Sequence, residues 1–146
     1  MAARLFASSV FPTPVGPKNN EIWYWGEYYD LANAISILGQ QGIPYSGPAI
    51  LSNKQVGDKY VITFDGPVTK LGLEITGGKV GKSYPIFADM PGLSSCNTTH
   101  IQIPESVTHM LTYCFLYNRA LQDFTIPNSV THVDTLAFNY IKWYSI

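Results

Sequence analysis

The sequence predicts a mainly β protein with little helix, in which an aromatic-rich cap precedes a short repeat solenoid. The first observation is a repeat: residues 103–109 (IPESVTH) return as residues 126–132 (IPNSVTH), an offset of 23, and Phe115 returns as Phe138 at the same offset. The second is the aromatic run at residues 21–30. A fixed spacing in the twenties is typical of solenoids, whose units bury their apolar sides against neighbouring units.

Each repeat unit reads as a short strand, a turn and a compact return segment. Apolar residues alternate with polar ones before the proline, as Ile101 and Ile103 in one copy and Phe124 and Ile126 in the next. This period of two predicts a strand with these side chains inward. The proline then ends the strand because it has no N–H to donate. Further predicted core positions are Val107, Phe115, Leu121, Val130 and Phe138.

An opening rung of the same kind is predicted at residues 61–71. Val68-Thr69 matches Val107-Thr108, but at an offset of 39 instead of 23. The 16 residues by which the first offset exceeds the second divide into 11 around residues 72–82 and 5 around residues 92–99. Insertions in a solenoid go to loops on one face, often the binding face. Simple drift in an atypical terminal unit is the alternative. The rungs are expected near 61–100, 101–123 and 124–146.

The run IPxSVT, followed by a small residue with Phe and then a leucine, resembles the BspA-like leucine-rich repeats. Ala137-Phe138 fits the pair as it stands, whereas Cys114 replaces the small alanine before Phe115. The upstream runs IWY (22–24) and VITFDGPVT (61–69) are similar to stretches that precede such repeats. The resemblance implies a short leucine-rich-repeat solenoid of the type found in surface proteins of gut and oral anaerobes and in proteins of their phages.

Residues 1–20 are expected to form an extended arm. The segment holds three prolines, which favour extended or polyproline II backbone. Its apolar residues give it anchors for docking on another virion protein, and a loosely packed arm is the alternative. The candidate docking residues are Leu5, Phe6, Val10 and Phe11.

Residues 21–60 are expected to form a cap over the first rung. The aromatic run favours a strand. Asp30 is a candidate N-cap of a helix through Leu38, with Leu31, Ala34, Ile35 and Leu38 on one face and Gly39 at its end. Residues 49–51 and 59–64 read as strands of a hairpin, and residues 61–146 then carry the repeats.

Composition limits the classes of partner and compartment. Charged residues make up 13% of the chain and the net charge is −1, so the sequence lacks the excess of basic residues that is typical of nucleic-acid-binding proteins. A surface this poor in charge is typical of a protein partly covered in an assembly. No apolar run approaches 18 residues, and residues 1–11 do not read as a secretory signal. We therefore expect no membrane insertion and a phage particle assembled in the host cytoplasm, with a bacterial cell surface as the alternative.

The motifs of catalysis and metal binding are weak or missing. His109 and His132 should lie about 5 Å apart in stacked rungs, but a zinc site needs three or four ligands. Glu21, Glu27 and Asp30 show no pairing of the kind that glycosidases use. We expect a non-enzymatic protein without metal or cofactor.

The two cysteines, Cys96 and Cys114, do not form a disulfide framework. Cys114 occupies a core position of the repeat, and Cys96 lies in the second insertion. A disulfide between them stays open at this point.

Outward positions of the strands are the best candidates for a contact surface. His100, Gln102, Asp123 and Thr125 are predicted to face outward because their neighbours face the core. A second candidate surface is a sugar platform of Trp23, Tyr24, Trp25, Tyr28 and Tyr29. Alternation places Trp23 and Trp25 on one face of the strand and Tyr24 on the other, and one of these faces must be core. Trp143 and Ile146 mark an uncapped last edge, for which we expect self-association into a homo-oligomer.

These observations favour a structural or host-contact protein of a phage particle, such as a head fibre, a capsid decoration protein or a tail-associated protein. The alternative is a bacterial cell-surface adhesin that binds a host protein or glycan. A carbohydrate-active enzyme is the third and weakest class.

Overall fold

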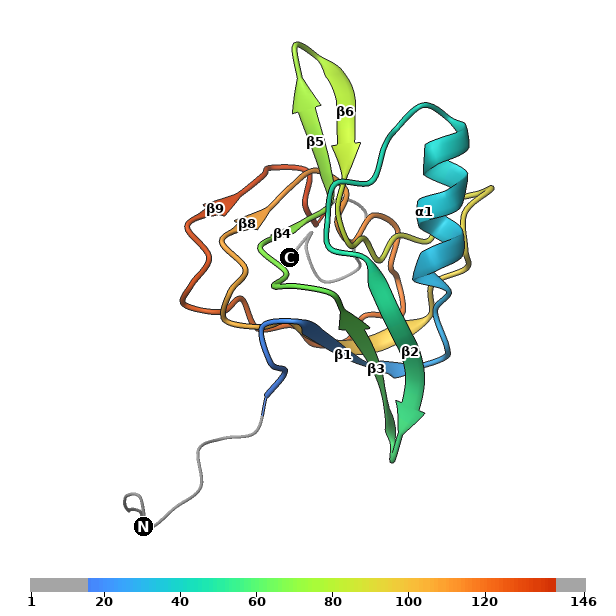
Figure 1. The fold of residues 1–146 in the computed structure, drawn as a ribbon, viewed down its shortest axis with the longest axis vertical. Helices are drawn as coiled ribbons and strands as arrows, with labels where there is room; N and C mark the ends of the chain where they lie inside the picture. The colour runs from blue at the N-terminus through green and yellow to red at the C-terminus, as the bar shows by residue number, and fades with distance from the viewer. Residues whose placement is uncertain (1–15, 139–146) are drawn as a thin grey trace.

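The computed structural model describes residues 16–138 and confirms a mainly β fold with one helix in that range (Figure 1). The predicted docking residues Leu5, Phe6, Val10 and Phe11 and the predicted edge residues Trp143 and Ile146 lie outside the described residues. In chain order the elements are β1 (Glu21–Gly26), α1 (Leu31–Gln40), β2 (Ile50–Val56), β3 (Lys59–Phe64), β4 (Lys70–Leu71), β5 (Leu73–Thr76), β6 (Lys79–Ser83), β7 (Thr98–Gln102), β8 (His109–Met110) and β9 (His132–Val133).

Three rungs stack in parallel along β4, β8 and β9, which lie side by side in Figure 1. Lys70 pairs with His109, which pairs with His132, so the register carries both the 39-residue and the 23-residue offsets. Backbone hydrogen bonds continue the ladder beyond the short strands, from Leu111 N to Leu71 O at 2.7 Å and from Asp134 N to Met110 O at 2.8 Å. The predicted stacking of repeat units is confirmed over these positions.

A second line of hydrogen bonds joins the return segments of the rungs. Phe87 N donates to Cys114 O at 2.8 Å, and Phe115 N donates to Ala137 O at 3.3 Å. Phe87, Phe115 and Phe138 are therefore equivalent positions, and the 23-residue offset predicts this for Phe115 and Phe138. The rings of Phe115 and Phe138 lie 5.6 Å apart between centroids, within the range of favourable aromatic pairs.

The first insertion forms the β5–β6 hairpin, which projects from the stack (Figure 1). The chain leaves the rung at Gly72, whose φ of +102° is unfavourable for residues with a side chain. A Cβ atom at this position would lie 2.8 Å from Thr112 O. The insertion therefore depends on a glycine at the point where it departs from the ladder.

The cap reaches the repeats through β1. The four-stranded sheet has the order β2-β3-β1-β7, and β1 is antiparallel to both β3 and β7. β3 and β7 consequently run parallel to each other, as successive rungs do, but β1 lies between them. The aromatic run at residues 21–26 thus enters the sheet itself instead of covering a rung from outside.

The helix begins as predicted and ends later than predicted. Asp30 is the N-cap, and its carboxylate accepts a hydrogen bond from Asn33 N at 3.1 Å. Leu31, Ala34 and Leu38 are buried, and Ile35 is half-buried against the core. Gly39 does not end the helix, because Gln41 N still bonds to Ile37 O at 3.2 Å. The left-handed residue that follows is Gly42, with φ of +85°.

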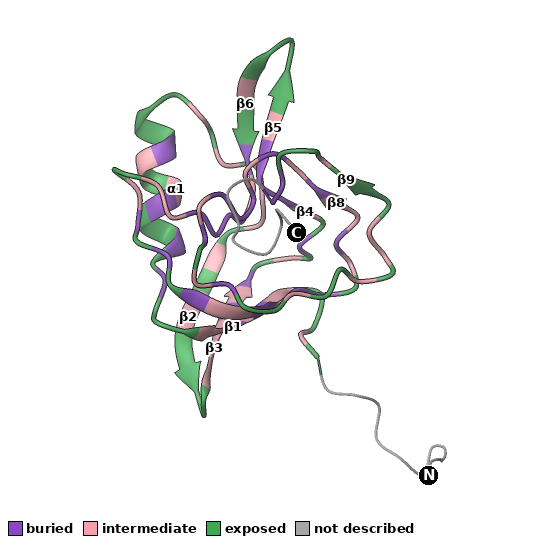
Figure 2. Ribbon diagram, turned by 180° about the vertical axis from the view of Figure 1, so that it is seen from behind, coloured by how far each residue is buried: buried purple, intermediate pink, exposed green. Residues whose placement is uncertain are grey.

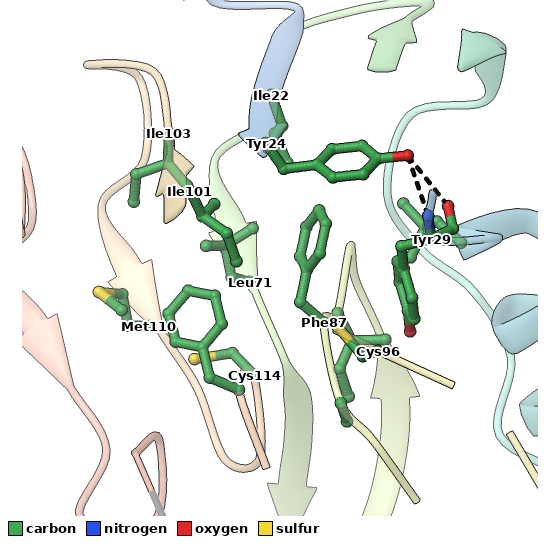
Figure 3. Close-up of a cluster of buried hydrophobic side chains, with 14 of the residues drawn as sticks. Ile22, Tyr24, Tyr29, Leu71, Phe87, Cys96, Ile101, Ile103, Met110 and Cys114 are labelled. Carbon is green, nitrogen blue, oxygen red and sulfur yellow. Dashed lines mark hydrogen bonds between the residues drawn. The ribbon is translucent and has the colours of Figure 1, made fainter. Parts of the chain in front are cut away.

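One continuous core joins the cap to the rungs. Figure 2 shows the hairpin tips exposed and the buried residues on the inward sides of the elements. In Figure 3 the Tyr24 ring extends from β1 toward Tyr29, and its hydroxyl accepts a hydrogen bond from Tyr29 N at 3.2 Å. The Phe87 ring lies 5.2 Å from the Tyr29 ring between centroids, which links the first rung to the cap.

The third rung departs from the predicted inward pattern. Phe124 is half-buried and its ring lies 4.9 Å from that of Phe115, but Ile126 is 43% exposed and residues 124–126 form no strand. The prediction that Ile126 faces inward is wrong. Within residues 16–138 no further rung lies beyond this one, and its side chains Ile126, Val133 and Leu136 are exposed.

We predict that Phe115→Ala will lower the free energy of unfolding by about 3–5 kcal/mol, because the ring is fully buried between neighbouring rungs. Urea unfolding followed by tryptophan fluorescence measures this change. The matched control is Leu51→Ala, whose side chain is 63% exposed and which should change stability by less than about 0.5 kcal/mol. Equal effects of the two substitutions would contradict the stacked core.

Candidate interaction surface

The outward side chains of neighbouring strands form one surface, which we call the outer face: Trp23, Trp25, His100, Gln102, Asp123 and Thr125. Along β1, Ile22 and Tyr24 are fully buried while the two tryptophans stay partly exposed. Along β7, Ile101 is buried while His100 and Gln102 stay partly exposed. Alternation along each strand separates the core side from the outer face, because successive side chains point to opposite sides of a sheet.

The strand register arranges the outer face in rows. Trp25 pairs with His100, and His100 forms a parallel bridge with Asp123 in the next rung. The His100 ring meets the Trp25 ring edge-on with 4.9 Å between centroids, and His100 Nδ1 lies 3.5 Å from Asp123 Oδ2. Trp23 pairs with Gln102 in the row alongside. The four predicted contact residues therefore face the same side.

A groove of about 350 Å³ opens along this surface. His100, Gln102 and Thr125 line it together with Glu105 and Pro127, and Gly16-Pro17 forms part of its wall. Its volume is at the lower end of the range of about 300–1,000 Å³ typical of ligand pockets. Asp123 lies beside the groove, where its side chain is 70% exposed. Three of the four predicted contact residues thus line a concave site.

Charged side chains flank the Trp23 ring on its face and at its indole nitrogen. Lys59 Nζ lies 4.4 Å from the centroid of the Trp23 ring, and Trp23 Nε1 donates to Glu21 Oε1 at 3.3 Å. Tyr24 lies on the opposite side of β1 from the tryptophans, as the alternation predicts, and the structure shows that its side is the buried one. The outer face is therefore an amphipathic surface, with aromatic rings next to hydrogen-bonding side chains.

The two equivalent histidines lie as the repeat predicts. The rings of His109 and His132 are 5.5 Å apart between centroids, and His109 Nδ1 lies 2.8 Å from Thr108 Oγ1. Residues 16–138 contain no group of three or more His, Cys, Asp or Glu placed to hold a metal ion.

The three carboxylates considered for catalysis each have a local partner. Glu21 accepts a hydrogen bond from Lys18 N at 3.1 Å, Glu27 accepts one from Asn97 Nδ2 at 3.2 Å, and Asp30 caps α1. None of the three carboxylates lines the groove of the outer face.

Both cysteines are buried and free. Burial raises the pKa of the Cys96 thiol from 9.0 to about 12, and burial also raises the pKa of Cys114. Cys96 Sγ lies 3.6 Å from Thr98 Oγ1, and Cys114 Sγ contacts Ala137 O at 3.6 Å. The structure therefore gives the two thiols packing roles in separate parts of the core.

Sequence analysis missed a second hollow, formed where the second insertion meets the return segment of the next rung. Its walls include Leu93, Tyr117 and Arg119. The only signal in the sequence was the extra length near residues 92–99, which does not reveal the residues opposite it.

A comparison with protein-family models matches residues 91–146 to the BspA type leucine-rich repeat region, a model of six copies. This match covers the second insertion, the two 23-residue units and the C-terminal residues. Searches of curated proteins and of solved structures found no match. None of the helices within residues 16–138 has the length and apolar character needed to cross a membrane.

We predict that both thiols will resist Ellman's reagent at pH 8 in the folded protein and react fully after unfolding in urea, because the thiolate is the reactive form. Absorbance of the released thionitrobenzoate measures the reaction. Immediate reaction of either thiol in the native protein would contradict its burial.

Stability should also fall as pH rises above about 9, since the unfolded chain then loses thiol protons that the folded chain keeps. The effect should extend toward pH 12, the folded-state pKa of both Cys96 and Tyr24. Urea midpoints at pH 7, 9 and 10.5 test the direction. The double variant Cys96→Ala, Cys114→Ala should show a shallower decline, and an unchanged slope would contradict the assignment to the thiols.

Proposed function

Because residues 91–146 are a BspA-type leucine-rich repeat region, we propose that this protein-interaction repeat domain serves as a non-enzymatic structural or host-contact component of a phage particle. A head fibre, a capsid decoration protein and a tail-associated protein are the forms that fit this role. The observation that carries the binding role is the outer face, which presents polar and aromatic side chains over a rigid hydrogen-bonded sheet.

The geometry of the outer face supports recognition of a partner surface. Its side chains come from three neighbouring backbone segments whose register is fixed by core residues, so their spacing is set before a partner arrives. Pre-organised side chains lose little conformational freedom on binding. The groove of about 350 Å³ adds a concave feature into which a partner side chain or sugar fits.

The composition and the last described rung support a place in an assembly. Only 13% of residues are charged. Three large apolar side chains of this rung are exposed, Ile126 and Val133 at 43% and Leu136 at 39%. Apolar surface at the end of a repeat stack is typical of an edge that another unit covers. Self-association is therefore part of the proposal.

A bacterial cell-surface adhesin is the second candidate, and the paired tryptophans of the outer face favour it. Indole rings next to amide, carboxylate and imidazole groups suit a glycan, whose C–H faces stack on aromatic rings while its hydroxyls form hydrogen bonds. Both candidate functions use the outer face. They differ in whether a phage particle or a bacterial cell displays the protein.

Mass spectrometry of purified phage particles tests the particle role. We expect peptides of this chain at a copy number comparable to other minor particle proteins. Detection on intact bacterial cells by surface labelling, with no peptides in purified particles, would replace the particle role by the adhesin.

We predict that the double variant Gln102→Ala, Asp123→Ala will reduce the rate at which particles adsorb to host cells severalfold, while particle yield stays unchanged. The matched control is Gln55→Ala, Asp58→Ala, which removes the same two residue types from the exposed β2–β3 hairpin. If both double variants adsorb like the unaltered particle, the outer face is not the contact surface.

Self-association is tested by analytical ultracentrifugation of the full chain. Val133→Lys places a charge on the outermost described strand and should shift the oligomer toward the monomer, whereas Leu51→Lys on β2 should not. A monomeric unaltered chain would remove this part of the proposal.

A further inference from the structure

The second insertion builds a hollow that is separate from the outer face. Its volume is about 500 Å³, and it lies between residues 89–95 and the return segment of the second rung. One side of the hollow is formed by the loop that carries the extra residues. A repeat unit without this insertion would therefore lack the hollow. The walls that matter here are Asp89, Met90, Pro91, Leu93, Tyr117 and Arg119.

The insertion is fixed to the rest of the protein at several points. Ser94 Oγ donates to Asp30 O at 2.9 Å and accepts from Asn33 Nδ2 at 3.0 Å, which ties the loop to the start of α1. In Figure 1 the chain between β6 and β7 runs beside this helix. Cys96 N donates to Asp89 Oδ1 at 3.2 Å and closes the loop on itself. One wall of the hollow is therefore held in place.

The opposite wall is held by the stacked rungs and a buried asparagine. Asp89 N donates to Leu116 O at 2.9 Å, which fixes the separation of the two walls. Asn118, between the two wall residues Tyr117 and Arg119, is fully buried, and its Nδ2 donates to Thr98 Oγ1 at 2.7 Å. Tyr117 adopts φ of +58°, an uncommon conformation for a residue with a large side chain. Such conformations persist where surrounding contacts hold them, and they are frequent at ligand sites.

The walls combine an aliphatic surface with one cationic side chain, Arg119, and one carboxylate, Asp89. Met90, Pro91 and Leu93 supply aliphatic surface. The Arg119 guanidinium carbon lies 5.2 Å from the centroid of the Tyr117 ring, so the cation is held against an aromatic face. Among residues 16–138 the one ion pair is His100–Asp123, so Arg119 has no carboxylate partner there. Asp89, in contrast, already accepts a backbone N–H.

We propose that this hollow binds a segment of a partner protein in which an apolar side chain lies next to a carboxylate. The apolar side chain occupies the space between Leu93 and Tyr117, and the carboxylate pairs with Arg119. Guanidinium and carboxylate groups form strong charge-assisted hydrogen bonds. The site is independent of the outer face and of the proposed particle role, because it depends only on the insertion and the second rung.

The test uses the full chain and two small probes that differ in one group. N-acetyl-phenylalanine carries the carboxylate, and N-acetyl-phenylalaninamide has the same apolar body without charge. In ¹H–¹⁵N spectra we expect the acid to shift the amide signals of residues 89–95 and 117–119 with a dissociation constant on the order of 1 mM. The amide should bind about tenfold more weakly.

Two substitutions, each of which removes one charge, then move the affinity in opposite directions. Arg119→Gln should weaken binding of the acid about tenfold. Asp89→Asn keeps an oxygen that accepts from Cys96 N but removes a like charge, and it should tighten binding severalfold. Lys79→Gln at the tip of the β5–β6 hairpin changes the net charge as Arg119→Gln does and should leave binding unchanged.

Equal binding of the two probes, or unchanged affinity in Arg119→Gln, would overturn the proposal. Weaker binding in Asp89→Asn would also overturn it, because the hollow would then recognise a cation. Shifts confined to the outer-face groove would assign the probe to another site and equally contradict it. All the substituted residues lie on the surface or keep their hydrogen bond, so the native spectrum provides the folding check.

Discussion

The parallel register of the rungs is the constraint on which the structure depends. Each rung places its backbone N–H and C=O groups opposite those of the next, from Leu71 to Leu111 and from Met110 to Asp134. This ladder brings equivalent side chains into contact, so Phe115 meets Phe138 and His109 meets His132. Along β1 and β7 the inward positions are core and the outward positions are surface. The outer face exists because the inner positions of the same strands are occupied by core residues.

The departures from regular stacking are where the protein acquires surface features of its own. β1 enters the sheet between β3 and β7 and brings two tryptophans onto the outer face beside His100 and Gln102. The second insertion, fixed by Ser94 and Cys96, opens the hollow at Arg119. The repeat ladder thus acts as a rigid frame, and the cap and the insertion supply its distinctive chemistry.

The sequence was sufficient for the features that repeat and insufficient for those that occur once. The 23-residue offset predicts the pairing of His109 with His132 because a solenoid maps sequence offset directly onto spatial neighbours. The alternation at Ile101 likewise predicts that Gln102 faces outward. In contrast, no local pattern indicates that β1 lies between β3 and β7, since strand order depends on long-range pairing. Ile126 was wrongly placed inward because alternation does not show whether a neighbouring rung covers a strand. The hollow at Tyr117 needs two segments that only the stack brings together.

Scalar couplings across hydrogen bonds test the stacked register most directly. In the ¹⁵N,¹³C-labelled chain, we expect couplings from Leu111 N to the carbonyl carbon of Leu71 and from Asp134 N to that of Met110, since both N···O distances are below 3 Å. Couplings across hydrogen bonds from these two nitrogens to the carbonyl carbons of other residues, beyond the covalent couplings within the chain, would show a different register and contradict the stacked solenoid.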